Sequence, residues 1–262
     1  MRFLRRLVPA AVLAAVTAAT LAGSVPVAAM GSAVHVTDIP RVGALYFPSG
    51  LGLTQRLDLP HHCSGSVVAS PGHNLVLTAA HCVYDAGLGY QFAPGYHDGQ
   101  FPYGLWTVRR VYVDPAWRAG HDPAHDWAFL AIAPLTVNGK VRNIQDLVGG
   151  YPLASAPPVG ATVTVDGYVA GHNDEPITCT TVTYRTVGFP SMDCDGFANG
   201  TSGGPWLEGG QVVGVIGGLH QGGCTPSTSY SAPFGADTVA DYARAVAGGA
   251  GDSPGFPGSD GC

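Results

Sequence analysis

Short runs of β-forming residues recur along this chain, and they constrain its fold more than any other feature. The runs are rich in Val, Thr, Ile and aromatic residues, and Gly, Pro and Asp residues separate them. They lie at residues 42–47, 65–69, 75–79, 106–113, 127–132, 162–169, 178–187 and 212–216. Short strands at regular spacing with turn residues between them are typical of an antiparallel barrel or sandwich. The sequence therefore predicts an all-β architecture.

A helical pattern is found only near the C-terminus, at residues 238–246. Apolar side chains in this run share one helical face, and Asp237 stands where it can cap the first turn. One C-terminal helix is therefore expected at the end of a domain that we place at residues 34–247. Inside that domain, residues 140–158 carry several Gly and Pro residues and favour a connector between two sets of strands. This position of the connector suggests two barrels.

The chain ends in a tail, residues 248–262, made mainly of Gly, Pro, Ser and Asp. Such a composition predicts a flexible segment that is too polar to pack into a core. Its last residue, Cys262, nevertheless implies that the tail is tied down.

The first 29 residues have the pattern of a secretory signal peptide. Three arginines precede an uncharged run of Ala, Val and Leu, and small residues follow at 27–29. A membrane anchor fits less well, because the run lacks the roughly 20 strongly apolar residues that a span requires. Cleavage is expected after Ala29 or Ala33. We therefore expect a secreted protein that has no membrane association once the signal is removed.

Charge and cysteine content narrow the function classes. Removal of the three signal arginines leaves nine basic residues against 18 acidic ones, and such an acidic surface argues against nucleic acid as a partner. All six cysteines lie beyond the signal, at positions 63, 82, 179, 194, 224 and 262. An even number in an exported chain favours disulfides over free thiols or a metal site.

Three motifs carry the chemistry of the chain: Thr-Ala-Ala-His-Cys at 78–82, Asp-Trp-Ala-Phe-Leu at 126–130 and Gly-Thr-Ser-Gly-Gly-Pro at 200–205. A serine hydroxyl is a poor nucleophile, so it needs an imidazole to take its proton and a buried carboxylate to orient that imidazole. The motifs supply His81, Asp126 and Ser202 for these roles, in this order. Asp126 fits better than other nearby aspartates because it directly precedes an apolar strand.

The glycines around Ser202 predict a tight loop whose backbone N–H groups converge on one point. The run 200–204 also matches the G-x-S-x-G turn of α/β-hydrolases. That fold requires an acid and then a histidine after the serine, together with helices that alternate with strands. His220 is the one histidine after Ser202, and Glu208 is the only acidic residue between them. The strand-rich pattern also lacks the alternating helices, so this alternative fails.

The three motifs resemble those of the trypsin-like (chymotrypsin-fold) serine peptidases, and in particular their small exported bacterial members, over residues 42–246. The resemblance implies two antiparallel six-stranded β-barrels with a C-terminal α-helix and an active site in the cleft between the barrels. It implies that His81 is the general base and then acid, Asp126 its orienter and Ser202 the nucleophile. Gly200 and Ser202 are the implied oxyanion hole. The implied protein is a monomeric endopeptidase that acts on protein or peptide substrates without a cofactor.

Two departures from the family pattern affect activation and disulfides. The residue before the nucleophile is Thr201, where zymogen-activated members commonly carry an aspartate that pairs with a newly formed N-terminus. The cysteine often found four residues before the nucleophile is Ala198 here, so Cys224 lacks its usual partner. On this basis the resemblance implies the pairs Cys63–Cys82, Cys179–Cys194 and Cys224–Cys262.

The resemblance also suggests a substrate-binding set. Gly196 stands where relatives that cleave after Lys or Arg carry an aspartate, and Phe197 follows it. Residues 216–219, Ile-Gly-Gly-Leu, resemble the edge strand that pairs with the substrate backbone, with Gly217, Gly218 and Leu219 as the implied binding residues. An apolar or small side chain is favoured at P1, the residue whose carbonyl is attacked.

Three alternatives remain open at this stage. Asp193 and Asp195 lie close enough to allow cleavage after a basic residue, whereas His220 and Ser231 can favour an acidic P1 residue, as in glutamyl endopeptidases. A peptidase fold that binds without catalysis is the rival from another class.

Histidine and aspartate residues cluster at 121–126, and His61 and His62 could add metal ligands. Their spacing does not match that of a known zinc site, so no metal is expected.

Overall fold

The structure is a computed structural model that describes residues 30–47, 61–84, 89–171, 174–258 and 262. The signal peptide predicted at residues 1–29 lies outside the described residues. Among those described, no helix has both the length and the apolar character needed to cross a bilayer.

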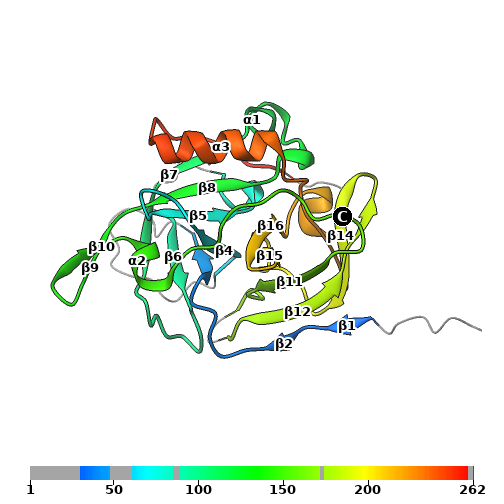
Figure 1. Cartoon of the computed structure of the whole chain (residues 1–262), viewed down its shortest axis with the longest axis horizontal. Coiled ribbons are helices and arrows are strands. Elements are labelled where there is room, and N and C mark those ends of the chain that lie inside the picture. The colour runs from blue at the N-terminus through cyan, green and yellow to red at the C-terminus, as the bar shows by residue number, and fades with distance from the viewer. Residues whose placement is uncertain (1–29, 48–60, 85–88, 172–173, 259–261) are drawn as a thin grey trace, which may run out of the picture.

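The first half of the chain forms a closed six-stranded antiparallel barrel (Figure 1). Its strands follow one another around the barrel in the order β3 (Val42–Tyr46), β4 (Cys63–Val68), β5 (Leu75–Thr78), β8 (Ala128–Ile132), β7 (Trp106–Val113) and β6 (Gln91–Pro94). β3, β4, β5 and β8 are buried along their whole length. The barrel predicted for this half is therefore confirmed.

The second half forms two sheets that flank a second apolar core. One sheet contains β16 (Gln211–Val215), β15 (Pro205–Glu208), β11 (Thr162–Gly167), β12 (Ile177–Val182) and β2 (Val34–His35). In the other, β14 (Phe189–Asp195) pairs with β13 (Tyr184–Thr186), β17 (Thr228–Tyr230) and β1 (Gly31–Ser32). The run predicted as one strand at 178–187 is thus divided at buried Thr183, where the chain passes from one sheet to the other.

Three disulfides join these elements, and no described cysteine is free. Cys63–Cys82 ties β4 to the turn after β5, Cys179–Cys194 ties the two sheets of the second half, and Cys224–Cys262 fixes the end of the chain. These are the same pairs that the family resemblance implies.

The helices differ from the single one expected. α3 (Ala236–Ala247) is the predicted C-terminal helix, but it begins after Gly235, so Asp237 lies in its first turn and is not the cap. α1 (Pro115–Gly120) begins after Asp114, whose carboxylate accepts a hydrogen bond of 2.7 Å from the Ala116 N–H. α2 (Ile144–Val148) lies in the predicted connector and follows the hairpin of β9 (Leu135–Val137) and β10 (Lys140–Arg142). Both additional helices are too short to give a periodic pattern in the sequence.

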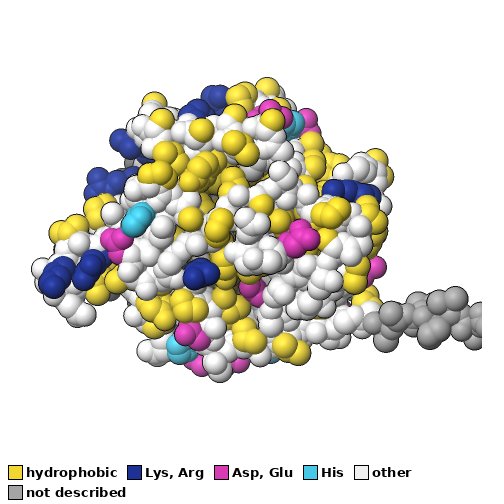
Figure 2. Space-filling view, viewed as in Figure 1, with side chains coloured by type: hydrophobic (Ala, Val, Ile, Leu, Met, Phe, Trp, Pro, Cys, Tyr) yellow, Lys and Arg dark blue, Asp and Glu magenta, His cyan; other side chains and the backbone are white. Residues whose placement is uncertain are grey.

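The connector joins the halves through a pair of isolated bridges. Tyr151 pairs with Val68 of the first barrel, and Leu153 pairs with Val212 of the second half. α3 then crosses back over β7 and β8 of the first barrel (Figure 1). On the face seen in Figure 2, Lys and Arg side chains are few and scattered, and several lie near the β9–β10 hairpin.

Asp166 of β11 is a buried carboxylate, and its burial raises its pKa from 3.8 to about 6, against the lowering effect of a hydrogen bond with Thr178. A raised carboxyl pKa lowers the free energy of unfolding as pH rises from about 4 to about 6, because the folded state resists ionisation. We expect Asp166→Asn to remove this slope and to increase the free energy of unfolding at neutral pH by up to about 3 kcal/mol.

Urea unfolding between pH 4 and pH 8 measures the effect. Asp98→Asn is the matched control, since its side chain is 61% exposed. An equal pH slope in wild type and Asp166→Asn would contradict the prediction.

Candidate active site

His81 and Asp126 form a short, well-oriented pair. The His81 Nδ1–H donates to Asp126 Oδ2 at 2.7 Å, and the His81 backbone N–H donates to Oδ1 at 2.9 Å. The Gly218 N–H donates a third hydrogen bond to Oδ2 at 2.8 Å. Asp126 is fully buried. Because Nδ1 carries its proton toward the carboxylate, Nε2 is the ring nitrogen available to accept a proton.

Local structure fixes both members of this pair. His81 lies in a 3-10 turn, Ala80–Cys82, which follows β5 and is clamped by the Cys63–Cys82 disulfide. Asp126 ends the turn before β8, and the next residue, Trp127, donates from Nε1 to Asp241 of α3 at 3.1 Å. The C-terminal helix therefore braces the strand end that carries Asp126.

A second histidine, His62, supports the turn of His81. Its Nε2–H donates to the Cys82 carbonyl at 3.0 Å, and its ring stacks on Phe47 with 3.6 Å between ring centroids. Burial lowers the pKa of His62 to about 4. His62 is therefore neutral near pH 7, where it serves as a hydrogen-bond donor and not as a charge.

The loop that carries Ser202 is held by a residue that sequence reasoning did not select, Ser64. The Ser64 N–H donates to the Ser202 carbonyl at 2.7 Å, and the Ser64 hydroxyl donates to the Gly200 carbonyl at 2.9 Å. Ser64 is fully buried in β4 of the first barrel. No local sequence signal marks it, because its partners lie more than 130 residues away along the chain.

The conformation at Gly200 turns its N–H away from Ala170. The Asn199 carbonyl accepts a hydrogen bond of 2.7 Å from the Ala170 N–H, and in a trans peptide the following N–H, that of Gly200, points the opposite way. Gly200 has φ of +99°, and a Cβ here would overlap with the Ala170 backbone nitrogen. Only glycine can therefore occupy this position without moving the loop.

Thr201 braces the same loop from within. Its hydroxyl donates to the Ala198 carbonyl at 2.8 Å, and its backbone N–H donates to the same oxygen at 3.2 Å. The side chain is buried, and no ion pair involves this position among the residues the structure describes. A neutral local hydrogen bond thus stands where zymogen-activated relatives use an ion pair.

Ser202 and His81 line one cleft of about 420 Å³, together with Phe47, Tyr84 and Gly200. Within the described chain, the Ser202 hydroxyl makes no hydrogen bond to His81. Such bonds are often long without substrate and tighten when it binds. An imidazole beside a serine hydroxyl, with a buried carboxylate behind it, can activate that hydroxyl for acyl transfer.

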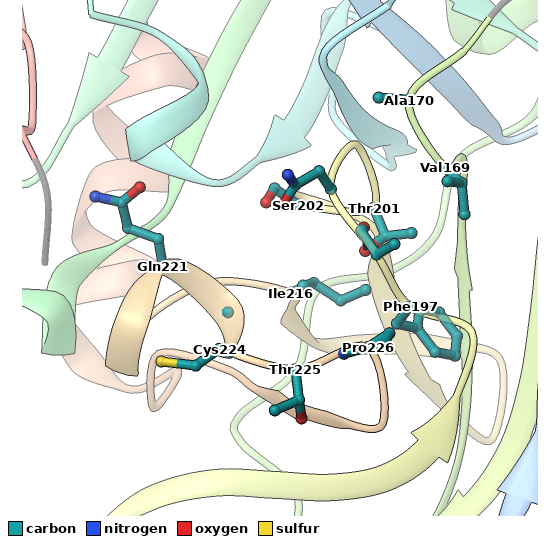
Figure 3. A pocket seen from close by; sticks show the side chains of 14 residues that line it. Val169, Ala170, Phe197, Thr201, Ser202, Ile216, Gln221, Cys224, Thr225 and Pro226 are labelled. Atoms are coloured by element: carbon teal, nitrogen blue, oxygen red, sulfur yellow. Dashed lines mark hydrogen bonds between the residues drawn. The ribbon is translucent and has the colours of Figure 1, made fainter. Parts of the chain in front are cut away.

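A pocket of about 560 Å³ opens beside Ser202 (Figure 3). Val169, Phe197 and Ile216 supply apolar side chains, and no charged side chain lines the pocket among the described residues. Thr225 and Pro226 lie at the side of the pocket away from Ser202 (Figure 3). The pocket therefore suits an uncharged side chain.

Of the expected substrate-binding residues, some line the pocket and others do not. Phe197 lines the pocket, whereas Gly196 is not part of its lining and packs near Ala33, which a Cβ at this position would meet at 3.2 Å. β16 ends at Val215, so the segment predicted as an edge strand at 216–219 is not a strand. Gly217 packs on Asp126, since a Cβ there would lie 3.0 Å from its Oδ2.

Gly218 has φ of +78° and leads into a 3-10 turn, Leu219–Gly222, which explains why the strand stops. His220 belongs to this turn and lines the cleft but not the pocket. Ser231 is fully buried, and its hydroxyl donates to the Ala232 carbonyl at 2.9 Å. The two residues considered for an acidic P1 side chain therefore lie outside the pocket lining.

The histidines and aspartates at 121–126 do not converge on one point. His121 Nε2 lies 3.3 Å from the Pro254 carbonyl, His125 lies near Asp122, and Asp126 is paired with His81. The described residues contain two groupings with metal-ligand proximity, around His81 and around His220. The cysteines of both are in disulfides, so neither grouping offers thiolate ligands.

Comparisons with known proteins agree with this geometry. Among solved structures, the chain is similar to protease Anisep from Arthrobacter nicotinovorans, with 25% identity and a TM-score of 0.67 over 81% of this chain and 98% of that one. The thermostable serine protease AL20 from an extremophilic microorganism is similar at 25% identity, with a TM-score of 0.65 over 80% and 98% of the two chains.

A Glu endopeptidase shares the fold, with 19% identity and a TM-score of 0.60 over 83% of this chain and 97% of that one. Among curated proteins, no significant match was found. A family model described as a trypsin-like peptidase domain matches residues 63–215, which is more than half of the chain. The chain therefore belongs to the trypsin-like peptidases.

Proposed function

We propose that this protein is a serine endopeptidase that uses His81, Asp126 and Ser202 as a catalytic triad. The observation that carries the proposal is the His81–Asp126 pair, which turns Nε2 toward the cleft that Ser202 also lines. The Ser202 oxygen attacks the peptide carbonyl carbon while His81 Nε2 takes the hydroxyl proton. His81 then returns this proton to the leaving amine, which leaves an acyl-enzyme on Ser202 that water hydrolyses.

In this proposal, the N–H groups of Gly200 and Ser202 stabilise the oxyanion of each tetrahedral intermediate. The Asn199–Ala170 hydrogen bond supports this role because it orients the Gly200 N–H before substrate binds. The Thr201–Ala198 hydrogen bonds support a loop that is formed without pairing to a new N-terminus. Activation by such pairing is therefore not required.

For specificity, we propose an apolar or small P1 residue. Val169, Phe197 and Ile216 line the pocket, and a charged P1 side chain buried there lacks a counter-charge among the described lining residues. A glutamyl-type preference is the less favoured alternative, because Ser231 is buried away from the pocket. The likeness to a Glu endopeptidase is one of fold alone.

The setting proposed for this activity is outside the cell, as a monomer acting on protein or peptide substrates. Three disulfides support an oxidising compartment, since such bonds persist mainly in exported proteins. The signal-like pattern at residues 1–29 supports the same location.

A serine-directed fluorophosphonate tests the proposal. We expect one covalent adduct on Ser202, mapped by mass spectrometry, and its loss in His81→Ala, because the hydroxyl is then no longer activated. A catalytically silent binding protein would show no adduct in either form. Cleavage profiling of a denatured protein digest then gives the P1 preference, and cleavage mainly after Glu would favour the glutamyl alternative.

A further inference from the structure

The segment that follows β16 offers little free backbone to a substrate. The Gly217 N–H donates to the Tyr230 carbonyl at 3.0 Å, and the Gly218 N–H donates to Asp126 at 2.8 Å. The Gly218 carbonyl accepts from the Gln221 N–H at 3.0 Å. An extended peptide adds to a sheet edge through unpaired N–H and C=O groups. Here three of these groups are already used within the protein.

The C-terminal tail is anchored on the first barrel at Asp252. The Asp252 N–H donates to the Val111 carbonyl at 2.8 Å, and its carboxylate accepts from the Val113 N–H at 3.0 Å. Arg244 of α3 forms an ion pair of 2.8 Å with the same carboxylate, whose side chain is 8% exposed. A second anchor is the Cys224–Cys262 disulfide, which holds the chain end to the second half.

Between these anchors, residues 254–258 lie beside the active-site cleft, against Tyr84 and Gln221, which line it. The Pro254 carbonyl lies 3.3 Å from His121 Nε2, and the Phe256 ring meets Tyr84 edge-on, with 5.2 Å between centroids. The Gly258 carbonyl accepts from Gln221 Nε2 at 2.9 Å. The tail thus contacts loops of both halves.

Pro257 helps to enclose a small hollow of about 110 Å³ beside the cleft. Its other walls are Trp117 of α1, His121 and Pro123 just after that helix, and the turn at 218–221. Cys262 lines the main cleft together with His81 and Ser202. The tail therefore occupies the space next to the segment where the substrate chain before P1 was expected to lie.

We propose that tail residues 254–258 and Cys262 are a specificity-determining element that restricts recognition of the substrate chain before P1. The inference rests on the proposed peptidase function and narrows its substrate class. A peptide that continues beyond P1 on this side meets backbone N–H groups of Gly217 and Gly218 that are already bonded within the protein, and it meets the tail beside them. Substrates are therefore selected by the P1 side chain and by residues after the scissile bond.

The test compares wild type with a variant that lacks residues 255–262 and carries Cys224→Ser, so that Asp252 and its contacts remain. The substrates are peptide amides with one P1 residue, one leaving group and one, two or four residues on the acyl side. We expect the kcat/KM of wild type to change by less than about threefold along this series. The truncated variant is expected to gain about tenfold with length, since the hollow becomes open to the substrate chain.

Two further variants keep the test decisive if truncation disturbs folding. Phe256→Ala with Pro257→Gly removes side chains of the tail and leaves both anchors, and a smaller gain of about threefold with acyl length is expected. Cys224→Ser with Cys262→Ser keeps the tail residues and shows the effect of losing only the covalent anchor. A gain with length in the variants that is missing in wild type supports the proposal.

The inference is overturned if wild type gains tenfold or more with acyl length, or if folded variants keep the wild-type length dependence. Fluorophosphonate labelling of Ser202, run in parallel, separates this result from failure of the proposed function. Normal labelling with an unchanged length dependence overturns the role of the tail alone. Absence of an adduct in wild type overturns the peptidase proposal and the role of the tail with it.

Discussion

Ser202→Ala is expected to lower kcat for peptide hydrolysis by roughly 10⁴- to 10⁶-fold, with KM changed little. The alanine has no oxygen to form the acyl-enzyme, while the pocket walls at Phe197 and Ile216 are unchanged. Residual hydrolysis would then come only from binding and from the N–H groups of the loop. Initial-rate assays with a peptide substrate identified by digest profiling measure both kcat and KM.

Ser155→Ala is the matched control, because Ser155 is an exposed serine of the connector. It should keep wild-type kcat. Circular dichroism and unfolding curves for Ser202→Ala should match wild type, since the loop is held by main-chain oxygens of Gly200 and Ser202 and not by the Ser202 hydroxyl. Activity of Ser202→Ala within tenfold of wild type would refute Ser202 as the nucleophile.

Asp126→Asn is expected to have the second largest effect, a loss of roughly 10⁴-fold in kcat near neutral pH. The carboxylate accepts three hydrogen bonds, one of them from His81 Nδ1–H. When the NH₂ group of the asparagine side chain faces His81, Nδ1 has to accept its hydrogen bond. The single proton of the neutral ring then lies on Nε2. The imidazole is then unable to take the Ser202 proton.

Asp122→Asn provides the comparison for this variant. Asp122 lies four residues earlier in the same loop, its side chain is 49% exposed, and it accepts from the Ala124 N–H, a role that an asparagine oxygen can also fill. It should retain kcat within about twofold. Equal losses in the two variants would indicate a general disturbance of the loop and would contradict the tautomer explanation.

Much of the fold was predictable from local patterns. Each of the eight β-forming runs contains at least one observed strand, because alternating and continuous apolar runs reflect burial directly. Strands such as β6 (Gln91–Pro94) and β15 (Pro205–Glu208) were missed, since each is four residues long and includes proline. The short helices α1 and α2 were missed because fewer than two turns give no periodicity.

The residues of the candidate site also fall into those that the sequence identifies and those that it does not. His81, Asp126 and Ser202 stand in distinctive local motifs, so their residue types and their order along the chain are enough to single them out. Ser64 was missed because a serine in a strand carries no mark of partners far along the chain. The strand predicted at 216–219 is wrong, since the sequence does not reveal that Gly218 adopts a positive φ and donates to Asp126.

The strand-rich architecture, the family and the residues expected to perform the chemistry can all be read from the sequence, because burial periodicity and short motifs depend on neighbours along the chain. Only the folded molecule shows which carbonyls Ser64 binds, which side chains line the pocket, and which loops the tail contacts. These contacts join segments far apart in sequence, and their geometry depends on how the two halves of the molecule pack against each other.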